Sequence, residues 1–258
     1  MKARYNPMEL MITIAARNLE DGAMVVVGTG VPCAAAMLAQ MTHAPNLTIL
    51  FEAGGVAPIL PTMPISVGDS RTTHKALKAT SMAEIMELCQ AGIVDYCFLG
   101  GAQIDKYGNL NSTIIGNDYY KPITRFPGSG GANDLASLCW KTLVVTPQNQ
   151  KRFANKVDFI TTPGYLQGGN SRYDAGLPAN TGPFKVITDI GVYGYHTETK
   201  EMMLLSLHPG KTMTDVQENT EFEILIPDQF ETTLEPTEEE LKTLREKVDP
   251  TQVIIGRS

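Results

Sequence analysis

Hydrophobic residues in this chain alternate between stretches with a helical period and short β-branched or aromatic runs. The stretches that predict helices are 8–19, 33–41, 82–91, 135–140 and 241–247, and the runs that predict strands are 23–27, 47–51, 93–99, 142–145, 157–161, 185–188, 191–195 and 202–207. Helices and strands alternate through the first two thirds of the chain. This order predicts an open, mostly parallel α/β sheet with helices on both faces.

The last third of the chain has a different pattern. Its three strand signals follow one another closely with turn residues between them, which predicts an antiparallel meander. The terminal helix begins with a capping box formed by Thr237 and Glu240. We therefore expect one domain over 1–258, with an α/β core to about residue 184 and an antiparallel extension with the terminal helix over about 185–258. The glycine-rich stretch 164–183 is the predicted mobile or ligand-covering loop.

Composition and charge narrow the class of protein. The chain has 258 residues, of which 43% are hydrophobic and 19% charged, enough to bury a sizeable core. Its net charge of −7 makes nucleic acid and anionic membrane surfaces unsuitable partners. No run approaches the about 18 apolar residues of a membrane helix, and the N-terminus has no signal-peptide pattern. We expect a cytoplasmic protein.

The four cysteines are Cys33, Cys89, Cys97 and Cys139. They form no Cys-x-x-Cys pair and have no metal-ligand spacing with the four histidines. Each lies in an apolar neighbourhood. The pattern predicts buried free thiols and no metal site.

Glu52 is the most informative polar position. It follows the predicted strand 47–51 and precedes Ala53, Gly54 and Gly55, whose small side chains leave room for a ligand to approach. Open α/β sheets place their chemistry at such strand ends. The alternative is a solvated loop charge or a helix cap.

Three predicted strand ends or helix starts carry glycine-rich turns, at 28–30, 100–101 and 128–131. Glycine permits a positive φ and a close approach of the backbone, and a following helix presents unpaired N–H groups, so such turns can bind an oxyanion or a phosphate. Each turn by itself could also be only a tight connection. The first lacks the third glycine of a dinucleotide-binding fingerprint.

These residues resemble a known family. The chain is similar to the β subunit of class I coenzyme A transferases of the glutaconate CoA-transferase type. The matching stretches occur in the family's order and span nearly the whole chain, at 27–32, 51–54, 66–69, 100–105, 107–111, 124–133 and 244–250. The resemblance implies a NagB/RpiA/CoA-transferase-like fold.

The resemblance also implies a mechanism in which Glu52 attacks an acyl-CoA and becomes a glutamyl-CoA thioester, with ping-pong kinetics. Coenzyme A is then substrate and covalent intermediate, dicarboxylic acids are candidate substrates, and no metal is needed. An α subunit of the same fold is implied as partner, in an α2β2 or larger assembly. The implied oxyanion and CoA-binding residues are Gly28, Gly30, Val31, Gly100, Gly101, Gln103, Asn109, Asn111, Gly130, Gly131 and Ala132.

Several side chains have a structural alternative. Asp69 either orients a substrate or partner group, or forms an Asx turn or helix N-cap before 72–77. His74 is expected to be a surface or satisfied histidine. Asn109 and Asn111 could be turn residues. Arg125 could reach a CoA phosphate or a distal carboxylate, with a structural ion pair as the default.

Two other functions stay open. The same frame could carry a CoA-thioester hydrolase, a ring-opening hydrolase or a decarboxylase, because water access to the acyl intermediate decides the outcome. A non-catalytic partner subunit is the third hypothesis. An intact glutamate beside glycine-rich turns argues against it.

Overall fold

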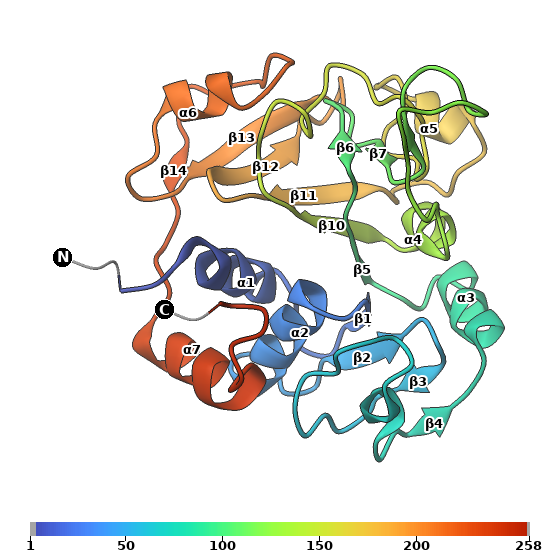
Figure 1. The fold of residues 1–258 in the computed structure, drawn as a ribbon, viewed down its shortest axis with the longest axis vertical. Coiled ribbons are helices and arrows are strands. Elements are labelled where there is room, and N and C mark those ends of the chain that lie inside the picture. The colour runs from blue at the N-terminus through green and yellow to red at the C-terminus, as the bar shows by residue number, and fades with distance from the viewer. Residues whose placement is uncertain (1–3, 257–258) are drawn as a thin grey trace. The chain divides into compact units, whose positions relative to one another are not determined.

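A computed structural model describes residues 4–256 of the protein, which form two compact units (Figure 1). Unit 1 contains the chain up to Phe98 together with the segment that starts at Glu235, and unit 2 contains Leu99–Leu234. The C-terminal helix thus belongs to the N-terminal unit. This grouping differs from the expected one, in which the terminal helix is part of the antiparallel extension, because the order of residues in the chain does not reveal which distant helix a segment packs against.

Unit 1 is built on three parallel strands. Strand β1 (Met24–Val27) lies between β2 (Thr48–Phe51) and β5 (Tyr96–Leu99) and is parallel to both. Two short strands, β3 (Gly55–Val56) and β4 (Lys78–Ala79), extend the sheet beyond β2 in antiparallel pairing. The apolar runs of β1 and β2 are buried except at their first residues, as a covered parallel sheet requires.

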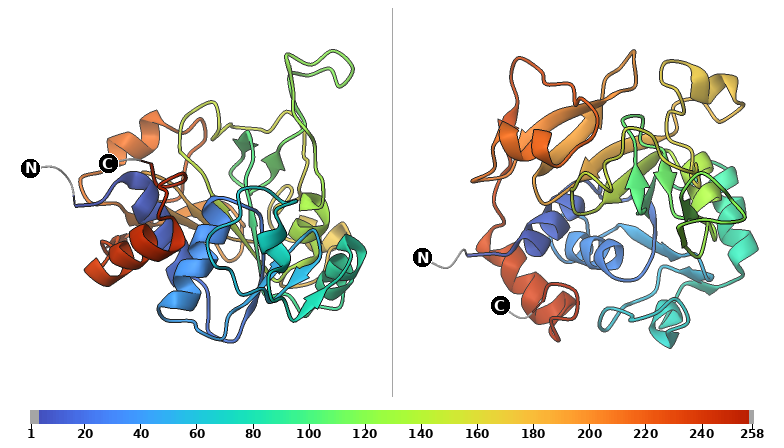
Figure 2. Two further views of the ribbon diagram at one scale, coloured as in Figure 1. Left: turned by 60° about the horizontal axis from the view of Figure 1, so that its bottom comes forward. Right: turned by 45° about the horizontal axis from the view of Figure 1, so that its top comes forward.

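The helices of unit 1 are α1 (Pro7–Arg17), α2 (Val31–Met41), α3 (Met82–Gln90) and α7 (Glu238–Thr243), and a 3₁₀ turn covers Ser70–Thr73. Helices α1, α2 and α7 pack together, and both views of Figure 2 show the red C-terminal helix beside the two blue ones. Helix α7 continues as a π-helical turn over Leu244–Val248.

Two arginine–glutamate ion pairs join the C-terminal segment to α1. Arg17 binds Glu240 through two hydrogen bonds of 2.8 and 2.7 Å, and Arg245 binds the buried Glu9 at 2.6 and 2.9 Å. Such bidentate pairs have a defined geometry. Glu240 also completes the predicted capping box with Thr237, which confirms the predicted start of this helix.

Unit 2 carries a mixed sheet. Strands β10 (Lys141–Val145) and β11 (Pro183–Ile187) are parallel, β12 (Gly191–Tyr195) and β13 (Met202–Leu207) follow in antiparallel pairing, and β14 (Glu231–Thr232) is parallel to β13. The predicted meander and α/β class are confirmed. The helices are α4 (Ala132–Leu138), α5 (Ser171–Asp174) and α6 (Met213–Glu218). Two short ladders pair β6 (Gln103–Ile104) with β7 (Leu110–Asn111), and β8 (Ile114–Ile115) with β9 (Thr124–Arg125).

The strand predicted over 157–161 is wrong. This stretch is irregular, and only an isolated bridge pairs Thr162 with Leu110. Side chains bond to part of its backbone: the Gln103 side-chain oxygen accepts from the Asp158 N–H at 3.0 Å, and the Asn133 amide donates to the Thr161 carbonyl at 3.0 Å. The other predicted strands and helices are present, with ends shifted by a few residues.

Candidate active site

Glu52 is the first residue after β2, at the carboxyl end of the parallel strands of unit 1. It is half-buried and starts a tight turn in which the Gly54 N–H donates to the Phe51 carbonyl at 2.9 Å. Strands β1 and β2 pair in register with Val27 opposite Phe51. Glu52 and Gly28 therefore leave the same edge of the sheet on adjacent strands.

The small residues after Glu52 are needed by the protein's own backbone. Gly54 has φ +117°, and a Cβ atom there would lie 1.9 Å from the Thr80 carbonyl oxygen; at Gly55 it would lie 1.9 Å from the Thr72 oxygen. The space that the sequence suggested for a ligand is thus occupied by the chain itself. The turn that positions Glu52 is sterically fixed.

Gly30 is the N-cap of helix α2, with φ +83°. It has no side chain to cap the helix, and Pro32 occupies one of the first two helical positions. The N-terminus of this 11-residue helix therefore presents backbone N–H groups, including that of Val31, without a side-chain cap. The positive end of the helix dipole lies at the same sheet edge as Glu52.

A mostly apolar cavity of about 420 Å³ lies in unit 1 beside this helix start. Thr29 and Gly30 line it, opposite residues from two distant segments: Met63 and Ile65 from the proline-rich loop, and Ile254 near the C-terminus. Sequence reasoning missed this cavity, since its walls come from three separate parts of the chain. Its size and lining suit an apolar group of a small ligand.

Asp69 and Arg71 form an ion pair near the rim of this cavity. Asp69 caps the 3₁₀ turn by accepting from the Arg71 N–H at 2.9 Å, and its carboxylate also binds the Arg71 guanidinium. Hydrogen bonds from Arg71 hold the pKa of Asp69 well below its usual range. The capping alternative for Asp69 is confirmed, but the element that Asp69 caps is a 3₁₀ turn over Ser70–Thr73 and not a helix over 72–77. His74 is exposed at the end of the same turn, as expected.

The predicted amides of unit 2 are buried in a hairpin that follows Gly100 and Gly101. The Asn109 side chain donates to the Asp105 carboxylate at 2.8 Å and to the Leu166 carbonyl at 2.8 Å, and it accepts from the Gly164 and Leu166 N–H groups at 2.9 and 3.1 Å. It is 1% exposed. These contacts give Asn109 a place in the scaffold of the loop.

Asn111 and Gln103 face each other across the same hairpin. The Asn111 amide donates to the Gln103 side-chain oxygen at 2.7 Å and to the Ile114 carbonyl at 2.6 Å, and its own oxygen accepts from the Thr113 N–H at 3.0 Å. The Gln103 oxygen also accepts from the Asp158 N–H at 3.0 Å. Both side chains thus bond within the protein.

Sequence reasoning missed Asp105, which organises this hairpin. Its carboxylate accepts from the N–H groups of Tyr107 and Asn109, each at 3.0 Å, and burial raises its pKa. The signal was available as an aspartate two residues before Tyr107-Gly108, a pattern typical of an Asx turn.

The third glycine turn lies in unit 2 and is joined to Ser112 by a hydrogen bond of 3.0 Å from the Gly128 N–H. Gly131 is the N-cap of α4, where Ala132 begins a helix of 7 residues. The Ser129 hydroxyl already accepts from the Asn133 N–H at 3.0 Å. One N–H group at the start of α4 is therefore already used within the protein, whereas no side chain accepts from the N–H groups at the start of α2.

The structure thus divides the predicted site residues into two groups. Unit 1 brings Glu52, Gly28, Gly30 and Val31 to one sheet edge. Unit 2 holds the rest: Gly100, Gly101, Gln103, Asn109, Asn111, Gly130, Gly131 and Ala132. The participation of the second group at Glu52 stays a prediction.

Two further predictions have a clear outcome. All four cysteines are buried free thiols, as expected. Arg125 is exposed on the β8–β9 hairpin, where it lies 4.5 Å from the Tyr119 ring centroid and donates to the Tyr119 carbonyl. It makes no ion pair with any residue between 4 and 256, so the default interpretation for Arg125 was wrong.

Within residues 4–256, no group of three or more histidine, cysteine, aspartate or glutamate side chains is arranged to hold a metal ion. None of the described helices has the length and apolar character needed to cross a membrane.

Comparison with known proteins identifies the family to which this chain belongs. The chain belongs to the coenzyme A transferase family, whose model matches residues 8–219. It is 39% identical over 242 residues to the B-type subunit of 3-oxoadipate CoA-transferase from Pseudomonas knackmussii, covering 93% of this chain and 92% of the relative. It is 37% identical over 256 residues to the B-type subunit of glutaconate CoA-transferase from Acidaminococcus fermentans, covering 97% and 95%.

The solved structure of glutaconate coenzyme A-transferase from Acidaminococcus fermentans superposes with a TM-score of 0.93 at 35% identity, covering 99% of both chains. The resemblance inferred from the motifs is confirmed, and so is the subunit type. The chain is a coenzyme A transferase β subunit.

Proposed function

We propose that this subunit transfers coenzyme A between carboxylic acids through a covalent thioester on Glu52, with dicarboxylic acids as candidate substrates. The observation that carries the proposal is the position of Glu52 at the carboxyl end of β2, on the same sheet edge as the start of helix α2, which no side chain caps. A nucleophile and a set of backbone donors at one edge are the two parts that acyl transfer requires.

The proposed reaction needs no external reductant or base, because every bond that forms is matched by one that breaks. A Glu52 carboxylate oxygen attacks the thioester carbonyl of the donor, the C–S bond breaks, and an acyl-glutamyl anhydride and CoA thiolate form. The thiolate then attacks the glutamyl carbonyl, and the C–O bond of the anhydride breaks to release the donor acid. A glutamyl-CoA thioester remains. The acceptor acid enters and the same steps run in reverse.

Each attack passes through a tetrahedral oxyanion. Hydrogen bonds from preorganised donors are worth about 2.7–4 kcal/mol each in such transition states. We assign this role first to the N–H of Val31 and the turn at Gly30, since no side chain caps α2, whereas the Ser129 hydroxyl already accepts from the Asn133 N–H in the first turn of α4. The steric constraint on Gly54 keeps Glu52 in place during attack, and such positioning can supply roughly 7 to 11 kcal/mol of the barrier.

A partner subunit is part of the proposal. Both relatives named above are B-type subunits, so we infer that an A-type chain of similar fold assembles with this one, in an α2β2 or larger complex, and contributes to selecting the acid. The buried amides of Asn109 and Asn111 would then act by holding the 103–111 hairpin in shape. Coenzyme A is the only non-protein group that the scheme uses.

Trapping the intermediate tests the proposal. The enzyme assembled from both subunits is incubated with candidate acyl-CoAs in the absence of acceptor, digested, and searched by mass spectrometry for CoA, or its borohydride-reduced product, on the peptide containing Glu52. We expect the label on Glu52 in the wild type and no label in Glu52→Gln. Glu87→Gln, at an exposed position on α3, is the matched control and should label normally. Turnover without any label on Glu52 would refute the covalent mechanism.

Shortening the nucleophile distinguishes transfer from hydrolysis. Glu52→Ala should abolish transfer. Glu52→Asp withdraws the carboxylate by one methylene, and a misplacement of about 1 Å can cost 100-fold, so transfer should fall more than thioester hydrolysis, for which water can fill the gap. Transfer at the wild-type rate in both variants would show that the nucleophile is elsewhere.

A further inference from the structure

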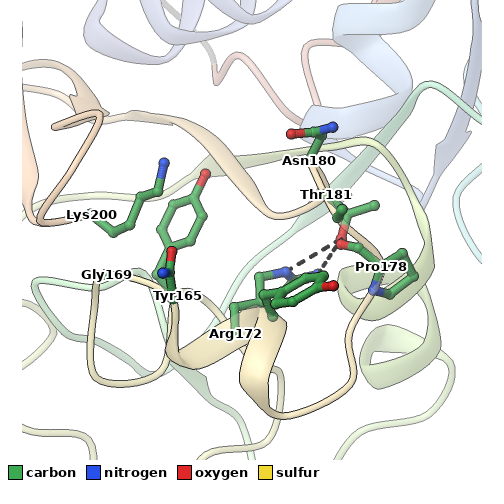
Figure 3. Close-up of a pocket in the computed structure, with 10 residues that line it drawn as sticks. Tyr165, Gly169, Arg172, Pro178, Asn180, Thr181 and Lys200 are labelled. Carbon is green, nitrogen blue, oxygen red and sulfur yellow. Dashed lines mark hydrogen bonds between the residues drawn. The ribbon is translucent and has the colours of Figure 1, made fainter.

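Unit 2 contains a second cavity that none of the proposed chemistry uses. It has a volume of about 450 Å³ and is lined by the loop before α5, by α5 itself, by the segment 178–181 and by Lys200 (Figure 3). None of the residues assigned to the reaction lines it. Its size falls in the usual range of small-molecule sites.

Three polar side chains on the wall of this cavity form no hydrogen bond or ion pair with the residues that the structure describes. The Lys200 ammonium lies 5.4 Å from the Tyr165 ring centroid and has no hydrogen bond or ion pair to any residue that the structure describes. The side-chain amides of Asn170 and Asn180 likewise bond to no described residue. In Figure 3, Lys200 and Asn180 are carried by separate segments on the wall of the cavity. These groups can supply donors to a ligand.

The charge of the wall is positive. Arg172 is 4% exposed and is fixed in place by the Ala136 carbonyl at 2.7 Å and by the Thr181 hydroxyl at 3.0 Å. Lys200 adds a second positive charge, and none of the ten lining residues is acidic. In a chain with a net charge of −7, such a local excess favours an anionic ligand.

The cavity also offers an aromatic surface. The side chain of Tyr173 on α5 is 67% exposed and lines the cavity together with Pro178. An exposed ring can stack on a planar base, and asparagine amides can bond to the edge of that base. A lysine ammonium is a common phosphate ligand. The volume of about 450 Å³ exceeds what a lone phosphate would fill.

We propose that this cavity binds a phosphorylated nucleoside, with a phosphate at Lys200 and Asn180 and the base against Tyr173. Two sources share this chemistry. One is the nucleotide end of coenzyme A, an assignment that rests on the proposed function. The other is a free nucleotide that binds independently of the reaction.

Calorimetric titration of the assembled two-subunit enzyme with ADP, adenosine and inorganic phosphate tests the site. We expect ADP to bind more tightly than either fragment. Lys200→Asn and Asn180→Asp both keep a residue suited to the positive φ of these positions, +61° and +63°. Each substitution should lower the affinity for ADP by about tenfold or more and leave the affinity for adenosine nearly unchanged.

Lys151→Asn is the matched control, since Lys151 is exposed and does not line the cavity. It should bind ADP as the wild type does, and thermal melting should show that all three variants are folded. The absence of ADP binding to the wild type, or equal ADP affinity in all variants, would overturn the proposal.

Competition with CoA separates the two sources. If CoA displaces ADP and Lys200→Asn raises the KM for acyl-CoA with little change in kcat, the cavity holds the nucleotide end of CoA. If ADP binds and CoA does not compete, the ligand is a free nucleotide. Both results support the site. If the wild-type enzyme binds ADP but turns over without a CoA label on Glu52, the proposed covalent mechanism is refuted and the assignment of this cavity is still supported.

Discussion

Replacing Asn109 with alanine removes an amide that joins separate segments of unit 2. Its neutral hydrogen bonds are those to the Leu166 carbonyl and from the Gly164 and Leu166 N–H groups, and a fourth, charge-assisted contact reaches Asp105. At about 1 kcal/mol net for each neutral bond and roughly 2 kcal/mol for the contact with the carboxylate, truncation should cost about 5 kcal/mol. Burial already raises the pKa of Asp105. Loss of its amide partner disfavours the ionised form further.

The measurement is guanidinium denaturation followed by the fluorescence of Trp140, the sole tryptophan, which lies in unit 2. Asn117→Ala makes the same change at an exposed position and should leave the midpoint unchanged. If Asn109→Ala unfolds at the wild-type midpoint but loses CoA transfer, the amide acts on a ligand and the scaffold role is refuted.

Two further predictions concern pH and the turn beside the nucleophile. Burial lowers the pKa of His208 from about 6.5, so the folded state binds fewer protons than the unfolded state, and the free energy of unfolding should fall as pH drops through about 6.5, by at most about 1.4 kcal/mol per pH unit. Denaturation over a pH series should show this dependence flattened in His208→Gln and retained in His74→Gln. Gly54→Ala should lower stability by roughly 2 kcal/mol or more and reduce transfer, because φ +117° and the nearby carbonyl exclude a Cβ atom; Ala53→Gly should change stability by less than about 1 kcal/mol, and equal melting temperatures for the two variants would contradict the steric argument.

The periodicity of the sequence was sufficient for most elements. The alternating apolar runs predicted β1, β2 and the β11–β13 meander, and the capping box at Thr237 predicted the start of α7. The stretch 157–161 has the same apolar character but forms no strand: the Gln103 side chain accepts from the Asp158 N–H, and the Asn133 amide donates to the Thr161 carbonyl. The hydrophobic pattern alone cannot distinguish a strand from an irregular segment whose backbone N–H and C=O groups bond to side chains.

The sequence by itself determined that Glu52 follows a buried strand, since burial pattern and turn residues are properties of neighbouring positions. Only the tertiary structure decided what surrounds this strand end. Only glycine fits at position 54, because a Cβ atom there would collide with the Thr80 carbonyl oxygen. Ile254 reaches the cavity at Gly30 because α7 packs beside α1 and α2. These contacts join residues far apart in the chain, and their free energy depends on shape and hydrogen-bond partners that no local pattern records.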